Sequence, residues 1–172
     1  LVYRNSDGSI SALISAEPRW MRDGTGGWVE IDRSLVVTPA GSYVGVRSPE
    51  ATRLGSSSLD GVAVPVTEGE LVLRHPDAVA VMGTLSGDRQ ALSFSGTLGD
   101  GRDVVEQLVA GGVEEQVVLP DASMASYDVT IALPAGISAA QRGRDVVFRR
   151  AGAAIAHFSA GDASDSNDQP ST

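Results

Sequence analysis

The stretch GGVEEQVVLPDASMASYDVTIAL, from Gly111 to Leu133, decides the fold class of this chain. Its apolar side chains stand at alternate positions on either side of a polar loop, with Val113, Val117 and Leu119 before it and Tyr127, Val129, Ile131 and Leu133 after it. Because successive side chains of a strand point to opposite faces, this alternation predicts strands with one solvated and one buried face. Each fully buried Val, Ile or Leu is worth roughly 1.5–3 kcal/mol. The stretch therefore predicts an all-β domain.

Composition restricts the classes of function. The chain has 172 residues, 42% of them hydrophobic and 20% charged, which is typical of one globular domain or two small ones. Its formal charge of −9 disfavours binding to nucleic acid or to an anionic membrane surface. No apolar run approaches the ~20 residues that span a bilayer, so no membrane insertion is expected. Cysteine and lysine are both absent, which excludes disulfides, thiolate metal sites, cysteine nucleophiles and lysine Schiff bases within this chain.

Paired strands are expected at the beginning of the chain. Turn-forming residues at Asn5–Gly8 precede a strand of alternating residues from Ile10 to Ala16. The glycine-rich segment Asp23–Gly27 then predicts a reversal, with Trp28–Asp32 as the returning strand.

Short strands separated by turns are expected through the middle of the chain. Residues 36–60 contain a short strand around Val44 and Val46, interrupted by glycine and proline. From residue 61 onward, strands are expected at Val62–Val66, Glu70–Arg74, Ala78–Met82 and Ala91–Ser95. This spacing is typical of an antiparallel β-sandwich, a barrel or a meander of short hairpins.

Residues 103–110 fit either a short amphipathic helix or the first strand of a hairpin. The short length and the adjacent strand favour the hairpin. The apolar residues mirror one another about the Ala-Gly-Gly turn, which sets Val105 opposite Val117 and Val109 opposite Val113.

The last part of the chain ends in a hairpin and a polar tail. A short coil or helical turn is expected over residues 138–142, followed by strands at Val146–Phe148 and Ala154–Ala156. Residues 1–158 therefore form a β-rich module, either as one unit or as two subdomains of about 1–60 and 61–158. Residues 159–172, which lack core-forming side chains, are expected to be a flexible tail or linker.

The sequence contains no pattern that identifies catalytic, cofactor or metal chemistry. Its two histidines, His75 and His157, have no partner residues at the spacings typical of zinc sites or catalytic triads, and they are expected at the surface or at strand edges. No serine lies in a G-x-S-x-G turn. Neighbouring carboxylates such as Glu114 and Glu115 are expected on solvated strand faces and loops, since a hydrolytic pair must face each other across a cleft. We therefore expect no cofactor and no enzymatic activity.

Trp20 and Trp28 are the candidate ligand contacts. They flank the predicted reversal at Asp23–Gly27, so a hairpin would bring the two indoles near each other. Aromatic side chains on a β-surface can stack on sugar rings, although a strand tryptophan more often fills a core or covers an edge. Both interpretations stay open at this point.

An ordered series of turn and strand signatures resembles the N-terminal module of secreted bacterial proteins that carry RHS/YD repeats. These proteins include WapA-like wall-associated proteins and polymorphic toxins, most commonly from actinobacteria. The matching segments are Arg4–Ser9, Ala12–Ser15, Pro18, Asp23, Gly27–Asp32, Ser34-Leu35, Gly99–Asp103, Gly112–Glu115, Val117–Leu119, Tyr127–Val129, Leu133–Gly136 and Val146–Phe158. The match is poor over residues 36–60, and an Asp/Ser tail replaces the proline-rich exit of the family.

This resemblance implies a non-catalytic, secreted or cell-wall-associated module that lies before a repeat-built shell. Its role would be domain packing, surface attachment or a scaffold for toxin delivery, with other domains of the same protein or a cell-wall glycan as partners. The first alternative is a carbohydrate-binding β-sandwich that uses Trp20 and Trp28. The second is a hydrolase with an Asp/Glu site, which a polar cleft with converging carboxylates of raised pKa would favour.

Overall fold

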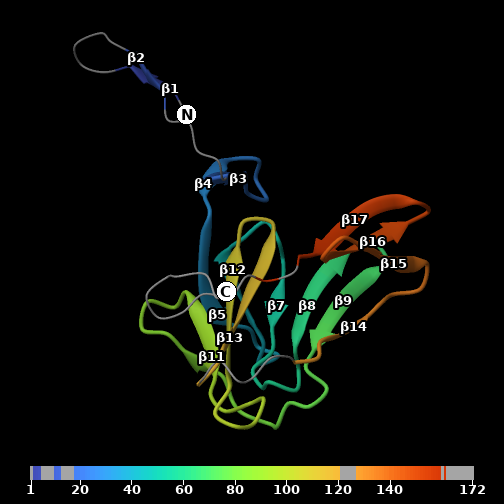
Figure 1. The fold of residues 1–172 in the computed structure, drawn as a ribbon. Helices are drawn as coiled ribbons and strands as arrows, with labels where there is room; N and C mark the ends of the chain where they lie inside the picture. The colour runs from blue at the N-terminus through green and yellow to red at the C-terminus, as the bar shows by residue number, and fades with distance from the viewer. Residues whose placement is uncertain (1, 5–9, 13–17, 121–126, 160, 162–172) are drawn as a thin grey trace.

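The computed structural model describes residues 2–4, 10–12, 18–120, 127–159 and 161, and every regular element among them is a β-strand (Figure 1). All the strand pairs in this part of the chain are antiparallel. The strands are β1 (Val2–Arg4), β2 (Ile10–Ala12), β3 (Trp20–Arg22), β4 (Trp28–Glu30), β5 (Asp32–Val37), β6 (Tyr43–Arg47), β7 (Arg53–Leu54), β8 (Val62–Val66), β9 (Gly69–Arg74), β10 (Thr84–Leu85), β11 (Ala91–Phe94), β12 (Asp103–Val109), β13 (Gly112–Val118), β14 (Thr130–Ala132), β15 (Ile137–Arg142), β16 (Asp145–Arg150) and β17 (Ala153–Phe158). The predicted all-β class is confirmed.

Two sheets enclose the main core. One has six strands in the order β14-β9-β8-β7-β6-β5, and the other has four in the order β10-β11-β12-β13. Because the buried cluster draws on both sheets and on the loop after β11, the arrangement fits a β-sandwich. The cluster consists of Leu35, Leu54, Val62, Leu92, Phe94, Leu98, Val104 and Leu108. The pairing of β7 with β8 crosses residue 60, so one sheet spans the position suggested for a subdomain boundary.

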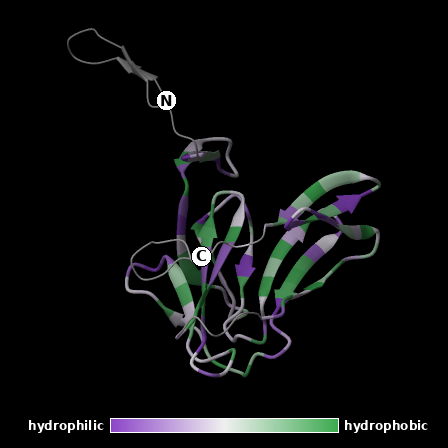
Figure 2. Ribbon diagram, in the orientation of Figure 1, coloured by the Kyte–Doolittle hydropathy of each residue, from purple (hydrophilic) through white to green (hydrophobic). Residues whose placement is uncertain are grey.

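Three smaller sheets adjoin this body. Strands β1–β2 and β3–β4 form two-stranded hairpins, and the β3–β4 hairpin projects from the end of the body where β4 leads into β5 (Figure 1). Strands β15-β16-β17 form a three-stranded sheet beside β8 and β9, with Phe148 buried outside the main cluster. The Arg150 side chain contacts the Glu68 carboxylate in the β8–β9 turn and so links the two sheets. Figure 2 shows hydrophobic residues along β8 and β9, interrupted by more hydrophilic ones.

The first half of the Gly111–Leu133 stretch alternates as predicted. In β13, Val113, Glu115 and Val117 are half-buried, and the residues between them are exposed. The second half alternates from Asp128 to Ala132, where Val129 and Ile131 are half-buried between exposed residues. The prediction is wrong for Leu119, Tyr127 and Leu133, which are all exposed, because they lie beyond the ends of the strands that would have buried them.

Two other segments differ from their predictions. Residues 78–82 are not a strand: the Val79 amide donates to the Thr97 carbonyl, and Met82 forms an isolated bridge with Ser57. Residues 137–142 form strand β15 instead of a coil or helical turn, and pairing with β16 holds them extended. The turn at Asn5–Gly8 and most of the strand predicted after it lie outside the described residues, as does nearly all of the predicted tail.

Residues 103–110 form the first strand of a hairpin, as predicted, but the register is shifted by one residue. The observed pairs are Val104 with Val117, Glu106 with Glu115 and Leu108 with Val113. The turn consists of two residues, Ala110 and Gly111, and Gly111 adopts a φ of +84° that glycine tolerates without strain. Because side chains alternate, a shift of one residue exchanges the faces of the strand. Val105 and Val109 leave the core side, and Glu106 enters it.

Candidate functional site

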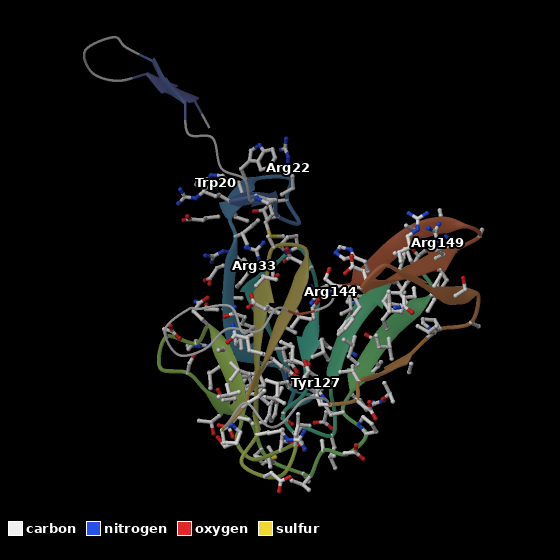
Figure 3. The ribbon with its side chains drawn as sticks, viewed as in Figure 1. Trp20, Arg22, Arg33, Tyr127, Arg144 and Arg149 are labelled. Carbon is white, nitrogen blue, oxygen red and sulfur yellow. The ribbon has the colours of Figure 1, made fainter. Side chains whose placement is uncertain are left out.

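The β3–β4 hairpin brings Trp20 and Trp28 onto one face. Its register pairs Trp20 with Glu30 and Arg22 with Trp28, so these four side chains point to the same side of the two-stranded sheet. We call this set the tryptophan face. Trp20 is 41% exposed and Trp28 is 62% exposed, so neither indole fills the core. Figure 3 shows Trp20 and Arg22 on the projecting hairpin, far from Tyr127 in the body.

The loop of this hairpin is held by one carboxylate. Asp23 Oδ1 accepts hydrogen bonds from the Thr25 amide at 2.9 Å, the Thr25 hydroxyl at 2.8 Å and the Gly27 amide at 2.8 Å. These bonds, the Thr25 hydroxyl first, lower the pKa of Asp23. Arg22 donates to the Gly26 carbonyl at 2.5 Å. The loop is therefore ordered by its own residues.

Arginine side chains order the tryptophan face and join it to the body. The Arg22 guanidinium carbon lies 4.3 Å from the centroid of the Trp28 ring, a cation–π contact that covers one side of that indole. Arg19 pairs with Glu30 at 3.3 Å. Arg47 on β6 donates to the Glu30 carbonyl at 3.0 Å, which ties the hairpin to the six-stranded sheet.

A second candidate site is a pocket of about 190 Å³ at the other end of the body. Its floor includes His75, which is 9% exposed, and the buried Leu98. The other lining residues are Asp77, Arg102, Tyr127 and Asp128. The prediction that His75 lies at the surface or at a strand edge is wrong. Pro76 and Asp77 turn the chain after β9, an inner strand of its sheet, and the imidazole packs against the Tyr127 ring. The two ring centroids lie 5.6 Å apart at an angle of 49°. His157 is exposed, as expected.

Behind His75 lies an acidic pair. His75 Nε2 lies 3.1 Å from Glu115 Oε2, and Glu115 stands directly across the hairpin from Glu106. Glu106 is 4% exposed, and its Oε2 atom has no hydrogen-bond partner among the described residues. Burial and then the charge of Glu115 raise the pKa of Glu106 to about 8. At neutral pH Glu106 is therefore mostly protonated, and Glu115 carries the charge that faces His75.

The same cluster also shifts the pKa values of the two aromatic side chains that line the pocket, His75 and Tyr127. Burial by itself lowers the pKa of His75, but the hydrogen bond and charge of Glu115, with the backbone of Asp128, outweigh it and raise that pKa. Partial burial and the charge of Glu115 raise the pKa of Tyr127. The cluster therefore contains two groups with raised pKa values, His75 at the floor of the pocket and Glu106 behind it.

The sequence points to Trp20 and Trp28 as candidate contacts but does not point to this cluster. With the register that we predicted, Glu106 would face Gln116 and point away from the core, so nothing marked it as buried. We expect Glu114 and Glu115 together on solvated surfaces, but the structure places them on opposite faces of β13, with Glu114 exposed and Glu115 half-buried. The one available signal was the length of the turn, because a two-residue Ala-Gly loop places Glu106 opposite Glu115.

Comparisons with protein-family models, with curated proteins and with solved structures gave no match to this chain. Across the described residues, no group of three or more His, Asp or Glu side chains has the geometry of a metal site. The same residues include no helix of the length and apolarity that crossing a membrane requires.

Proposed function

We propose that this chain is a non-catalytic interaction module of a larger secreted protein of the RHS/YD-repeat type, and that the tryptophan face is its contact surface. The observation that carries this proposal is the exposure of Trp20 and Trp28 on one side of an ordered, projecting hairpin. Trp and Arg are the residue types most enriched among the energetic centres of protein interfaces. Arg22, stacked on Trp28, completes such a set.

The exposed area is large enough to matter for binding. A tryptophan side chain offers up to about 250 Å² of surface, so the two exposed fractions together leave roughly 250 Å² to be covered. At about 25 cal/mol per Å², covering it contributes roughly 6 kcal/mol before the costs of association. The partner is proposed to be another domain of the same protein, which the hairpin reaches because it stands clear of the body (Figure 1).

The non-catalytic part of the proposal is supported by the place of Glu106, the carboxyl whose pKa is raised: it is 4% exposed and is not among the residues that line the pocket, so it does not converge there with Asp77 and Asp128. Two buried hydroxyls, those of Ser58 and Thr97, serve the packing of the fold. Ser58 Oγ donates to the Val79 carbonyl at 2.7 Å, and Thr97 Oγ1 donates to the same oxygen at 3.0 Å. Both hydroxyls thereby hold the segment after β9 against the core. This role leaves neither of them free to act as a nucleophile.

Pull-down with the adjoining domains of the natural full-length gene product, expressed as separate polypeptides, tests the proposal. The wild-type chain and a Val118→Ala control, which truncates an exposed residue on β13, are expected to retain an adjoining domain. The Trp20→Ala/Trp28→Ala double variant is expected to lose it. Equal retention by all three proteins, or no retention by the wild type, would refute the proposal.

The second candidate function is carbohydrate binding, which the placement of both indoles on one face favours. A variant of Arg22, which covers one side of the Trp28 ring, distinguishes carbohydrate binding from binding to a protein domain. Arg22→Ala opens that side to a sugar ring, so glycan binding is expected to persist or strengthen in this variant, whereas binding to a protein domain is expected to weaken. Tryptophan fluorescence that stays unchanged across a panel of cell-wall glycans would rule out the second candidate.

A further inference from the structure

We propose that the pocket formed by His75, Asp77, Arg102, Tyr127 and Asp128 binds the ammonium or guanidinium group of an organic cation. This site lies in the body, away from the tryptophan face (Figure 3), and does not depend on the function proposed for that face.

The charges around the pocket favour a cation. Asp77 and Asp128 are exposed at its rim, and neither carboxylate has a hydrogen-bond or ion-pair partner within the described part of the chain. Arg102 turns its guanidinium toward the chain, where Nη2 donates to the Leu98 carbonyl at 2.5 Å. Protonated His75 and Glu115 cancel each other. Two carboxylates against the one guanidinium of Arg102 leave the pocket with an excess of one negative charge, which an organic cation would neutralise.

The floor offers a buried acceptor. The His75 ring is nine-tenths buried and lines the pocket, and its Nδ1 atom has no hydrogen-bond partner among the described residues. The Asp128 backbone stabilises only the protonated ring, so when the ring is neutral and Nε2–H donates to Glu115, Nδ1 carries a lone pair that no described residue satisfies. An N–H group of the ligand can satisfy this atom, which otherwise costs desolvation energy.

Tyr127 supplies an aromatic wall. Its ring lies tilted against that of His75, with 5.6 Å between the centroids, and its outer part is exposed to solvent. A cation that enters beside the Tyr127 ring gains the attraction of the aromatic face. Carboxylates and an imidazole nitrogen accept hydrogen bonds, and together with a tyrosine ring they suit ammonium and guanidinium groups, which donate them.

The size of the pocket limits what enters it. A volume of about 190 Å³ is below the range of roughly 300–1,000 Å³ that encloses a whole drug-sized ligand. The pocket therefore takes either a small free cation or the end of a lysine or arginine side chain from a partner protein. Both sources share the same chemistry, and the experiment below distinguishes them.

Binding should strengthen as the pH rises. The titratable and charged groups that face His75 are Glu115 on β13, Glu106 on β12 behind it, Tyr127 and Asp128 before β14, Asp77 after β9 and Arg102 before β12. Loss of the His75 proton removes a positive charge from beside the ligand, and ionisation of Glu106 at about pH 8 adds a negative one. An anionic ligand would show the opposite dependence.

NMR titration of the whole chain with methylguanidinium tests the site, with acetate as the anionic comparison. We expect saturable shifts at His75 and Tyr127, with affinity that increases between pH 6 and pH 8. The Asp77→Asn/Asp128→Asn variant is expected to bind about tenfold more weakly or worse. The control Glu114→Gln, on the exposed face of β13, is expected to bind as the wild type does.

A capped tripeptide with a central arginine distinguishes the two sources. Binding at least about tenfold tighter than methylguanidinium identifies a side chain of a partner protein, and equal affinity identifies a small free cation. Both results support a cation site. The proposal is overturned if neither probe shifts His75 and Tyr127, if acetate alone does so, or if the double Asn variant, with its amide spectrum still folded, binds both probes as tightly as the wild type.

Discussion

Substitution of Glu106 by glutamine should stabilise the protein at alkaline pH. In the folded chain this side chain is 4% exposed and its pKa is about 8, against 4.5 for an unhindered glutamate. The folded state therefore holds a proton that the unfolded state releases as the pH rises above 4.5, so the wild-type protein loses stability between these two values. This difference between the two pKa values corresponds to a loss of about 3 kcal/mol of folding stability at pH 7, about 4 kcal/mol at pH 8, and roughly 5 kcal/mol well above pH 8.

Glutamine has the same shape and carries no charge, so Glu106→Gln removes this loss. The new amide has N–H groups to satisfy, which costs about 1–3 kcal/mol at every pH. We therefore expect the variant to exceed the wild type by about 2 kcal/mol or more at pH 8 and to match or fall below it at pH 5. The raised pKa of His75 adds stability below pH 6.5 that is lost as the pH rises through the folded value, and this contribution remains in both proteins.

Urea denaturation followed by far-ultraviolet circular dichroism at pH 5, 6.5 and 8 measures the effect, because this signal reports the strands and not the exposed tryptophans. Glu114→Gln is the matched control: it makes the same chemical change on the same hairpin, but on the exposed face. Its stability curve should stay within about 0.5 kcal/mol of the wild type. If the free energy of unfolding of the wild type and of Glu106→Gln changed with pH in the same way, Glu106 would not be buried as an acid, and the reasoning would be refuted.

Three further predictions concern other parts of the structure. Glu50→Gln should cost about 3 kcal/mol at pH 7. Burial by itself raises the pKa of Glu50, but hydrogen bonds from Arg33, Ser48 and the Gly111 amide outweigh it and lower that pKa to about 2. The stabilities of wild type and variant, measured by acid denaturation, should therefore converge as the pH falls from 4.5 toward 2. Gly61→Ala should cost more than about 3 kcal/mol in urea denaturation, since φ is +73° and a Cβ would lie 2.0 Å from the Leu73 carbonyl oxygen; unchanged stability would contradict the close approach of β8 and β9. Trp28→Ala should change stability by less than about 1 kcal/mol by the same assay, because the indole is mostly exposed; a larger loss would place it in the core.

The sequence predicted those strands whose two faces differ. Val113 and Val117 alternate with exposed residues because one side of β13 covers the core, and the sequence shows this as an alternation of apolar and polar residues. Strand β15 has no such contrast, since nearly all of it is exposed, and only its pairing with β16 makes it a strand. Residues 78–82 show the reverse case. These mostly apolar residues lie in an irregular segment, where the Val79 amide donates a hydrogen bond to the Thr97 carbonyl.

The two candidate sites also differ in how far the sequence predicts them. The placement of Trp20 and Trp28 on one hairpin could be predicted because a local turn joins their two strands. The Glu106–Glu115 pair depends on the register of β12 and β13, where a difference of one turn residue decides which face each side chain occupies. The approach of His75 to Glu115 joins residues 40 positions apart and follows from the packing of the two sheets. No local pattern in the sequence specifies such a contact.

Titration of the Glu106 side-chain carboxyl carbon by NMR tests the central claim most directly, namely that the β12–β13 register buries an acidic pair beneath the His75 pocket. Burial beside Glu115 predicts a midpoint near pH 8 for Glu106. A midpoint near 4.5 would place this carboxyl in water and contradict both the register and the cluster built upon it.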